Sequence, residues 1–245
     1  MPGSDPRISM GSASDTPRLS IIVPVLNEAL GMPQWLARLQ PCRQASCEII
    51  VVDGGSSDNT VQLATGLADQ IVISPSGRGC QMNTGAALAR GRVLLFLHAD
   101  TQLPPSAPAL IRQAIEHGAS WGRFDVRIEG TVSGLGLVAF MMNWRSRLSG
   151  IATGDQAIFV TREAFDRIGG FPDIPLMEDI VFSSQLRALS RPACLVEKVA
   201  TSGRRWEKHG VLRTILLMWQ LRLRFFFGAN PHDLAREYGY DPRKS

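Results

Sequence analysis

Short runs of apolar residues, many of them β-branched, alternate with stretches of helical spacing along the first hundred residues. The segment 60–68, for example, places Val61, Ala64 and Leu67 on one side of a helix, behind Ser57 or Asp58 as a cap. Runs that are apolar on both faces and recur between such helices are typical of parallel strands covered on both sides. The pattern therefore predicts an α/β fold, one domain with a mostly parallel sheet and helices on both faces, and strands at 19–25, 48–53, 71–73 and 92–98.

Polar residues stand where three of these strands end. The first strand is followed by Asn27-Glu28, the second ends in Asp53-Gly54-Gly55, and the fourth ends in His98-Ala99-Asp100. Ligands of parallel sheets bind beyond the carboxyl ends of the strands. The glycines after Asp53 allow a sharp turn and the close approach of a ligand, although Asp53 alone could equally be a turn and cap residue. We expect one site built from three loops.

Composition narrows the class of protein. The chain is 44% hydrophobic and 20% charged with a net charge of +4, as in ordinary globular proteins, so an anionic small molecule is a better partner than nucleic acid. The apolar stretches near 132–142 and 215–219 are shorter than the roughly 18 to 20 residues that cross a bilayer. Residues 1–17 lack a continuous apolar core and are predicted to be a flexible tail rather than a signal peptide.

The four cysteines, Cys42, Cys47, Cys80 and Cys194, lack the C-x-x-C spacing of a zinc site and are too sparse for a disulfide scaffold. Reduced thiols and a cytoplasmic location are the expectation.

Three segments, SIIVPVLNE, EIIVVDGGSSDNT and GRVLLFLHADT, resemble the nucleotide-binding half of the family 2 glycosyltransferases, which have a GT-A fold. The resemblance implies that residues 18–103 bind a UDP-sugar, with Glu28 and Asp53 on the uridine. The loop 77–85 lies where relatives approach the nucleotide, so Arg78 could pair with phosphate or ribose, or belong to a solvated turn. The residues expected around the nucleotide are Pro24, Asn27, Glu28, Asp53, Gly54, Arg78, Asn83, His98, Ala99 and Asp100.

The same family holds a divalent cation with a D-x-D motif, and here His98 replaces the first aspartate. A neutral imidazole can ligate Mn²⁺, whereas Mg²⁺ prefers oxygen. Either Mn²⁺ is preferred, or Asp100 holds the ion together with water and phosphate oxygens. His98 could be a ligand or a structural residue, and the resemblance suggests His209 as a further ligand.

The resemblance continues in Gly169-Gly170-Phe171 and Met177-Glu178-Asp179. In inverting members, the residue matching Asp179 is the general base that deprotonates an acceptor hydroxyl, and Glu178 orients this neighbourhood. Such a base must be ionised and within about 3 Å of the proton that it removes. Two acids would also be favourable at a helix N-terminus without any catalytic role.

Four phrases, FLHADT, GDQAIFV, GGFPDIPLMED and SGRRWEKHG, resemble a compact bacterial branch of the family that includes selenosugar synthase. That resemblance implies attack by the selenium of selenophosphate on C1 of UDP-N-acetylglucosamine or UDP-glucose, with release of UDP and phosphate. An already ionised selenium nucleophile would need a base less than a hydroxyl does.

An anionic acceptor requires cations, and residues 104–210 are expected to form the acceptor-binding and catalytic half. Arginine recognises phosphate with two prongs, and some of these arginines could instead pair with nearby acids. Arg123 is assigned a catalytic role, and Trp206 could stack on the sugar or belong to the core. Arg145 and Arg147 are further candidates, and the assigned acceptor-side residues are Asp155, Gln156, Arg204, Arg205 and Trp206.

Residues 211–245 are predicted to be a C-terminal helical segment, with a long basic and apolar helix at 211–227. That helix is expected to pack on the domain or on a second subunit of a homodimer, or to contact a membrane surface. The sequence also bears on three other functions. A dinucleotide-dependent oxidoreductase is disfavoured because neither Gly77-Arg78-Gly79 nor Asp53-Gly54-Gly55 completes G-x-G-x-x-G. A transferase acting on a lipid or sugar hydroxyl, or a non-catalytic nucleotide-sugar binder, remains open.

Overall fold

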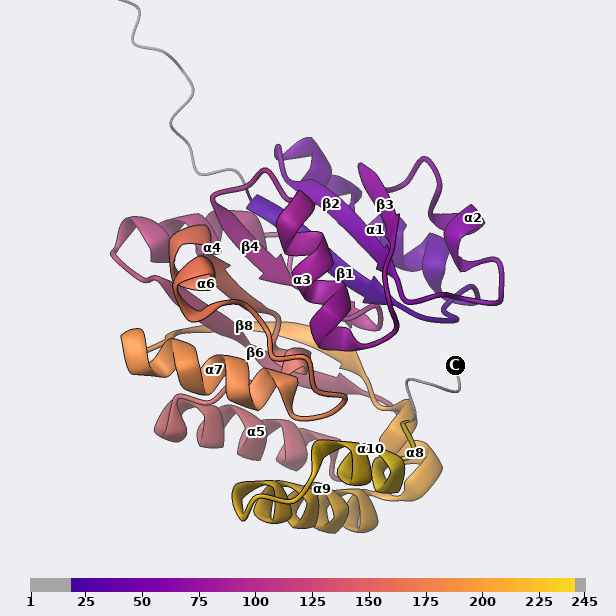
Figure 1. Cartoon of the computed structure of the whole chain (residues 1–245), viewed down its shortest axis with the longest axis vertical. Coiled ribbons are helices and arrows are strands. Elements are labelled where there is room, and N and C mark those ends of the chain that lie inside the picture. Colours follow the sequence, from indigo (N-terminus) through magenta and orange to yellow (C-terminus); the bar gives the residue numbers. More distant parts are fainter. Residues whose placement is uncertain (1–18, 241–245) are drawn as a thin grey trace, which may run out of the picture.

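An eight-stranded sheet runs through the computed structural model, which describes residues 19–240 (Figure 1). The strands lie in the order β3-β2-β1-β4-β7-β6-β8-β5. The tail predicted at residues 1–17 is outside the described residues. The strands are β1 (Leu19–Val25), β2 (Glu48–Asp53), β3 (Gln70–Ile73), β4 (Val93–Phe96), β5 (Thr101–Gln102), β6 (Trp121–Glu129), β7 (Ile158–Thr161) and β8 (Ala193–Ser202).

The first half of the sheet is parallel. β1 pairs with β2 and β4, and β2 pairs with β3, all in the parallel sense. β7 is antiparallel to both β4 and β6, β5 is antiparallel to β8, and β6 is parallel to β8. The predicted fold, a mostly parallel α/β sheet, is confirmed. Because Val25 is level with Asp53 in the register, the ends of β1 and β2 open onto the same edge.

Helices cover both faces of the sheet, as predicted. Side chains alternate along a strand, so Ile21 of β1 packs in the core beneath one helical layer while Ile22 packs beneath the other. One layer contains α1 (Met32–Gln44), α2 (Thr60–Ala64), α4 (Ala107–Glu116) and α5 (Leu135–Ser149). The opposite layer contains α3 (Arg78–Leu88), α6 (Arg162–Ile168) and α7 (Glu178–Leu189).

α3 lies unusually close to the sheet. A Cβ at Gly85 would overlap the side chains of Ile22 and Val52, so the helix reaches this position only because residue 85 is glycine. The close approach brings the start of α3, with Arg78, over the ends of β1 and β2.

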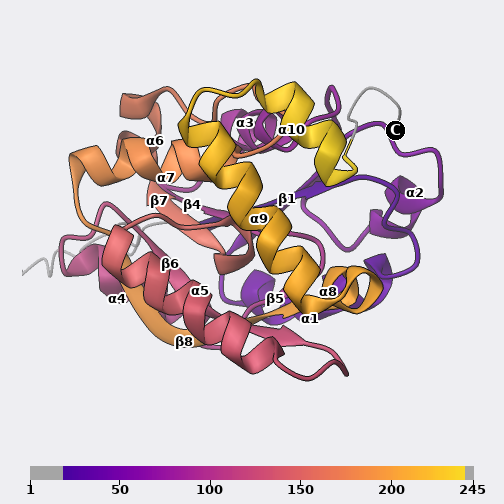
Figure 2. The same cartoon turned by 90° about the horizontal axis from the view of Figure 1, so that it is seen from below.

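The chain ends in three helices, α8 (Arg204–His209), α9 (Val211–Phe226) and α10 (Pro231–Tyr238). The helix predicted at 211–227 is therefore present. Leu221 and Leu234 of these helices pack on Leu176 and Met177, the residues that lead into α7. In Figure 2, α9 crosses the end of the molecule beside α5. Between residues 19 and 240, no helix has the length and apolar character needed to cross a membrane.

Candidate active site

The first two polar loops are tied together by hydrogen bonds. Asn27 Oδ1 accepts from the backbone N–H of Ser57 at 2.9 Å, and the N–H of Glu28 donates to Thr60 Oγ1 at 2.8 Å. The N–H of Ala29 donates to Asp58. Asn27 has a positive φ of 54°, a conformation that asparagine tolerates better than most residues. These hydrogen bonds therefore join the loop after β1 to the loop after β2 along one edge of the sheet.

Asp53 holds the turn at the end of β2. Its side chain is 1% exposed, and Oδ2 accepts from the N–H groups of Gly55 at 2.9 Å and Ser56 at 2.8 Å. Oδ1 accepts from the Ser56 hydroxyl. Asp53 thus stabilises the turn after β2, as the turn-and-cap alternative proposes. A contact between Asp53 and uridine stays a prediction.

Sequence reasoning missed Gln81, which lies beneath this edge. Its amide Nε2 donates to the carbonyl of Val25 at 2.9 Å and to that of Val52 at 2.8 Å, so it joins the ends of β1 and β2. Gln81 is buried on the side of α3 that also carries Met82. A glutamine within an otherwise apolar helix face was the signal available in the sequence.

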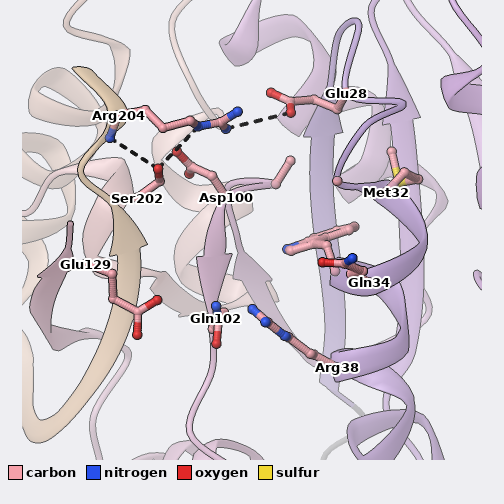
Figure 3. A pocket seen from close by; sticks show the side chains of 12 residues that line it. Glu28, Met32, Gln34, Arg38, Asp100, Gln102, Glu129, Ser202 and Arg204 are labelled. Carbon is pink, nitrogen blue, oxygen red and sulfur yellow. Dashed lines mark hydrogen bonds and ion pairs between the residues drawn. The ribbon is translucent and has the colours of Figure 1, made fainter. Parts of the chain in front are cut away.

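A cavity of about 340 Å³ lies between α1, the loop after β4 and the end of β8 (Figure 3). Glu28 and Asp100 project into it, and Arg204 Nη2 lies 4.0 Å from Glu28 Oε2. The pKa of Glu28 is raised, chiefly by burial and further by the charges of Asp100 and Asp58, while Arg204 opposes the rise. Glu28 and Asp100 thus line one cavity, as predicted. Arg204, which was predicted on the acceptor side, lines the same cavity.

The α1 side of this cavity was not anticipated. Trp35 and Arg38 of α1 line it together with Gln102, and the Trp35 indole N–H donates to the carbonyl of Thr101 at 3.3 Å. Ala99, predicted at the nucleotide site, also lines the cavity. No motif in residues 32–44 indicated a site, because the buried residues of α1, among them Leu36 and Leu39, are apolar and pack in the core.

A second group of charges surrounds His98. The His98 Nδ1 atom is 3.6 Å from Asp155 Oδ1, and a Cβ at Gly154 would overlap the imidazole ring. Burial alone would lower the pKa of His98, but the hydrogen bond and charge of Asp155 raise it overall. Burial would likewise raise the pKa of Asp155, but His98 and Arg78 lower it. His98 is thus held as an ion-pair partner of Asp155.

Arg78 and the start of α7 complete this group. Burial raises the pKa of Glu178 to about 7, helped by the adjacent Asp179 and opposed by Arg78 and His98. Burial alone would lower the pKa of Arg78, but Glu178, the two tyrosines of the C-terminal region and Asp155 together raise it. The Arg78 guanidinium lies 5.6 Å from the centroid of the Tyr240 ring. Arg78 is therefore surrounded by acids and an aromatic ring, and the solvated-turn alternative is wrong.

Two arginines of the outer helices lie close together, and one of them, Arg145, is attracted by Asp179. Arg145 of α5 and Arg222 of α9 each have a buried Nε with no protein hydrogen-bond partner among residues 19–240, and Nη2 of Arg145 is in the same state. The pKa of Arg145 is lowered to about 10, first by burial and then by repulsion from Arg222, while Asp179 opposes the shift. Two close, unpaired guanidiniums are suited to an anion. Arg222 was missed because the sequence predicted the helix at 211–227 but gave no sign of which of its arginines would turn inward.

Two acceptor-side assignments are wrong. Arg123 is 0% exposed on β6, forms an ion pair with Asp125 and donates to the carbonyl of Asn143, so it stabilises the core beneath α5. Gln156 is also 0% exposed, and its Oε1 accepts from the N–H of Thr153 in a capping box. Strand alternation turns Arg123 inward, and the capping box turns Gln156 inward, so both side chains are closed off from a substrate.

Three other predicted residues have structural partners. Pro24 is buried within β1. The Asn83 amide donates to the carbonyl of Phe171 at 2.8 Å and accepts from its N–H at 2.9 Å, which fixes the turn before α7. Arg205 lies 3.4 Å from the centroid of the Tyr238 ring and donates to the Tyr238 carbonyl, so it fastens α10 to α8. Trp206 is half-buried on α8, and its stacking on a sugar stays a prediction.

The predicted set of metal ligands does not come together. Within residues 19–240 no group of three His, Cys, Asp or Glu side chains could hold an ion, because His98 is engaged with Asp155 and His209 is exposed at the end of α8. Asp100, beside Glu28, still offers carboxylate oxygens to the cavity. This donor set fits a cation held mainly by a ligand's own oxygens and completed by Asp100.

Comparison with known proteins agrees with this architecture. The model for "Glycosyl transferase family 2" matches residues 20–168, and the chain belongs to that family. An undecaprenyl-phosphate 4-deoxy-4-formamido-L-arabinose transferase of Pseudomonas fluorescens is 34% identical over 146 residues, which are 55% of this chain and 41% of the relative. The chain spans about two fifths or less of the length of the curated relatives it matches.

Solved structures share the fold. S. aureus TarS 1–349 in complex with UDP-GlcNAc has a TM-score of 0.62 and 18% identity, covering 76% of this chain and 58% of TarS. The mannosyltransferase PcManGT of Pyrobaculum calidifontis, in complex with GDP-Man and Mn²⁺, has a TM-score of 0.59 and 18% identity, covering 76% of this chain and 57% of that protein. At this identity, the likeness concerns the GT-A fold.

Proposed function

We propose that the protein is an inverting glycosyltransferase that takes a sugar from a UDP-sugar and delivers it to an anionic acceptor. The observation that carries the proposal is a set of interacting charges that connects Asp100, through His98 and Glu178, with Asp179. Asp179 in turn interacts with Arg145, and the buried Nε atoms of Arg145 and its neighbour Arg222 have no protein hydrogen-bond partner among residues 19–240. A direct displacement at C1 of the sugar requires the acceptor to be held on the side of C1 opposite the departing UDP.

The donor would lie along the edge formed by the loops after β1, β2 and β4, within residues 18–103. Glu28 and Asp53 would select the uridine, with Asn27 and Gly54 shaping the edge. Arg78 would offset the negative charge that grows on the departing UDP, because it is a half-buried cation at the start of α3, next to this edge. The TarS complex with UDP-GlcNAc supports a nucleotide-sugar donor on this fold.

A divalent cation, Mn²⁺ or Mg²⁺, would be held by Asp100 and the diphosphate, and would neutralise phosphate charge when bound. The Mn²⁺ in the PcManGT structure supports this proposal. His98 would act indirectly, by holding Asp155 and the 154–156 turn against Asp179.

The acceptor half, residues 104–210, would be completed by Arg222 from the C-terminal segment 211–245. The particular acceptor that the sequence resemblance indicates is selenophosphate, as in selenosugar synthase. Its selenium would form a bond to C1 of UDP-N-acetylglucosamine or UDP-glucose, and the C1–O bond would break with its electron pair leaving on UDP. Water would then cleave the Se–P bond and release phosphate. Arg145 and Arg222 would hold the phosphate group.

A hydroxyl acceptor on a lipid or sugar is the second candidate function. One observation favours a lipid that carries such a hydroxyl: the outer surface of α5 and α9, the same helices that carry Arg145 and Arg222, is apolar. In that reaction Asp179 would remove the proton of the hydroxyl as the oxygen attacks C1. A cytoplasmic site of action stays a prediction in either case.

The deciding experiment incubates the purified protein with UDP-N-acetylglucosamine or UDP-glucose, Mn²⁺, and either selenophosphate or a long-chain lipid alcohol. Mass spectrometry identifies the products. A selenosugar with UDP and phosphate supports the first acceptor, and a glycosylated lipid supports the second. UDP release from neither mixture, with UDP nevertheless bound, would leave a nucleotide-sugar binder and overturn the proposed activity.

A further inference from the structure

The solvent-facing side of α9 is apolar. Leu212, Leu216, Trp219, Leu223 and Phe226 follow one another at intervals of three or four residues, and all are exposed, Trp219 by 67% and Phe226 by 82%. An amphipathic helix on a protein surface normally turns such a stripe inward and its polar residues outward. In α9 the buried residues are Thr214 and Leu221. The exposed stripe is therefore a second apolar side of the helix, and no other part of residues 19–240 covers it.

α5 repeats this arrangement. Leu137, Phe140, Met141, Trp144 and Leu148 form an exposed stripe with the same helical spacing, and Trp144 is 52% exposed. Figures 1 and 2 both place α5 and α9 at the same end of the molecule, and Figure 2 shows them running alongside each other. We call the two exposed stripes together the apolar face. Exposed apolar residues that gather at one end of a molecule in this number mark an interaction site.

The charges on these helices are of one sign. α5 and α9 contain five arginines and no Asp or Glu. Two of the arginines are paired with acids of neighbouring elements, Arg147 with Asp125 and Arg224 with Glu237. Tryptophan and arginine side chains combine an apolar body with a polar end, and both are favoured at the boundary between water and lipid.

A second cavity opens beside α5. It has a volume of about 260 Å³ and is lined by Phe140 and Trp144 of the apolar face and by Arg127, Arg147 and Lys198. Asp125 also lines it and is already paired with Arg147. Arg127 is likewise paired with Glu129, so within residues 19–240 Lys198 is the cation of this cavity that has no ion pair with an acid. Apolar side chains beside such a cation are suited to a phosphate headgroup whose acyl chains lie against the helices.

We propose that the apolar face docks on a bilayer that contains anionic phospholipids. A second copy of the chain is the less favourable occupant, because a symmetric interface would set the arginines of each copy against those of the other. The proposal does not rest on sugar transfer. If both hold, docking brings Arg145, Arg222 and Asp179, on the inner sides of these helices and α7, close to the lipid surface.

Sedimentation with vesicles tests the proposal. One set of vesicles is phosphatidylcholine alone, and the other is an equal mixture of phosphatidylcholine and phosphatidylglycerol. We expect the protein to bind the mixed vesicles, and the double variant Trp144→Ser/Trp219→Ser to bind at least about tenfold more weakly, since each lost side chain removes buried apolar area. Ile73→Ser, at an exposed apolar residue of β3, is the matched control and should bind like the wild type.

A charge variant keeps the test decisive if the double variant does not fold. Arg213→Glu changes an exposed residue of α9 and leaves the apolar stripes intact, so it should weaken binding to the mixed vesicles. Calorimetry with UDP in the absence of vesicles should give wild-type affinity for each variant, which separates this proposal from the proposed function. Failure of the wild type to bind mixed vesicles, equal binding by the variants, or a dimer that Trp219→Ser dissolves would overturn lipid docking.

Discussion

The backbone N–H of Gly154 donates a 2.9 Å hydrogen bond to Oδ2 of Asp179. The other carboxylate oxygen, Oδ1, accepts from the N–H of Ile180 at 2.7 Å. The hydrogen bond thus joins the 154–156 turn to the start of α7, 25 positions further along the chain. The carboxylate is held in one orientation by backbone groups, and each oxygen keeps a lone pair for a proton. Orientation of this kind is what a general base needs.

Asp179→Asn distinguishes the two acceptor classes. With a hydroxyl acceptor, kcat should fall by about 10²- to 10⁴-fold, because proton removal is lost. With selenophosphate, whose selenium is already ionised, we expect a loss of less than about tenfold. Steady-state kinetics with both acceptors measures the ratio. Equal large losses with selenophosphate would contradict an ionised nucleophile, and no loss with any acceptor would remove Asp179 from catalysis.

Asp100→Asn should weaken the response to metal. Without this carboxylate the cation is left to the diphosphate and water, so we expect kcat/KM to fall by about 100-fold and the half-saturating Mn²⁺ concentration to rise. Glu129→Gln is the matched control, since Glu129 lines the same cavity but pairs with Arg127 at 2.8 Å. A normal Mn²⁺ titration in Asp100→Asn would show that the ion is bound elsewhere.

The raised pKa of Glu178 makes a prediction about stability. As pH rises from about 4.5 to about 7, the unfolded chain releases this proton while the folded chain retains it, so Glu178 progressively favours the unfolded state. Above pH 7 the penalty is complete, on the order of 1–3 kcal/mol. Glu178→Gln should therefore match the wild type at low pH and be more stable at pH 8, as urea denaturation would measure.

The control for this effect is Glu116→Gln at the exposed end of α4, which should not change the pH dependence. If the stability difference between Glu178→Gln and the wild type were the same at every pH, burial would not be acting on the ionisation of Glu178.

Arg222→Gln tests the anionic acceptor. Removing one of two adjacent guanidiniums should raise the KM for the acceptor about 10- to 100-fold, with little change in the affinity for UDP, because charge-assisted hydrogen bonds to phosphate are lost. Arg167→Gln, at an exposed arginine of α6, is the control. A change in UDP affinity without any change in the acceptor KM would place Arg222 on the donor side.

The N-terminal half of the fold was predictable because its strands are short, apolar on both faces and followed by polar turns. Asp53 and Asp100 could be placed at strand ends for that reason alone. Arg123 could not be assigned correctly, because whether a strand side chain faces the core depends on the partner strand, and β6 pairs with β7 and β8, which lie distant in sequence.

The residues of the acceptor side could not be predicted from local sequence patterns either. Arg222 approaches Arg145 only because α9 and α10 fold back on Leu176 and Met177. No spacing in the sequence records that contact. The sequence alone could not decide whether His98 is a metal ligand or a structural residue. Its partner Asp155 belongs to the 154–156 turn, which is distant in sequence.

The central claim is that UDP binds along the edge shared by Glu28, Asp53 and Asp100. A crystal structure of the protein with UDP and Mn²⁺ tests it most directly. The account predicts uracil beside the turn at Asp53 and the diphosphate, with its metal, against the Asp100 carboxylate. A nucleotide bound at any other place, with these three loops empty, would contradict it.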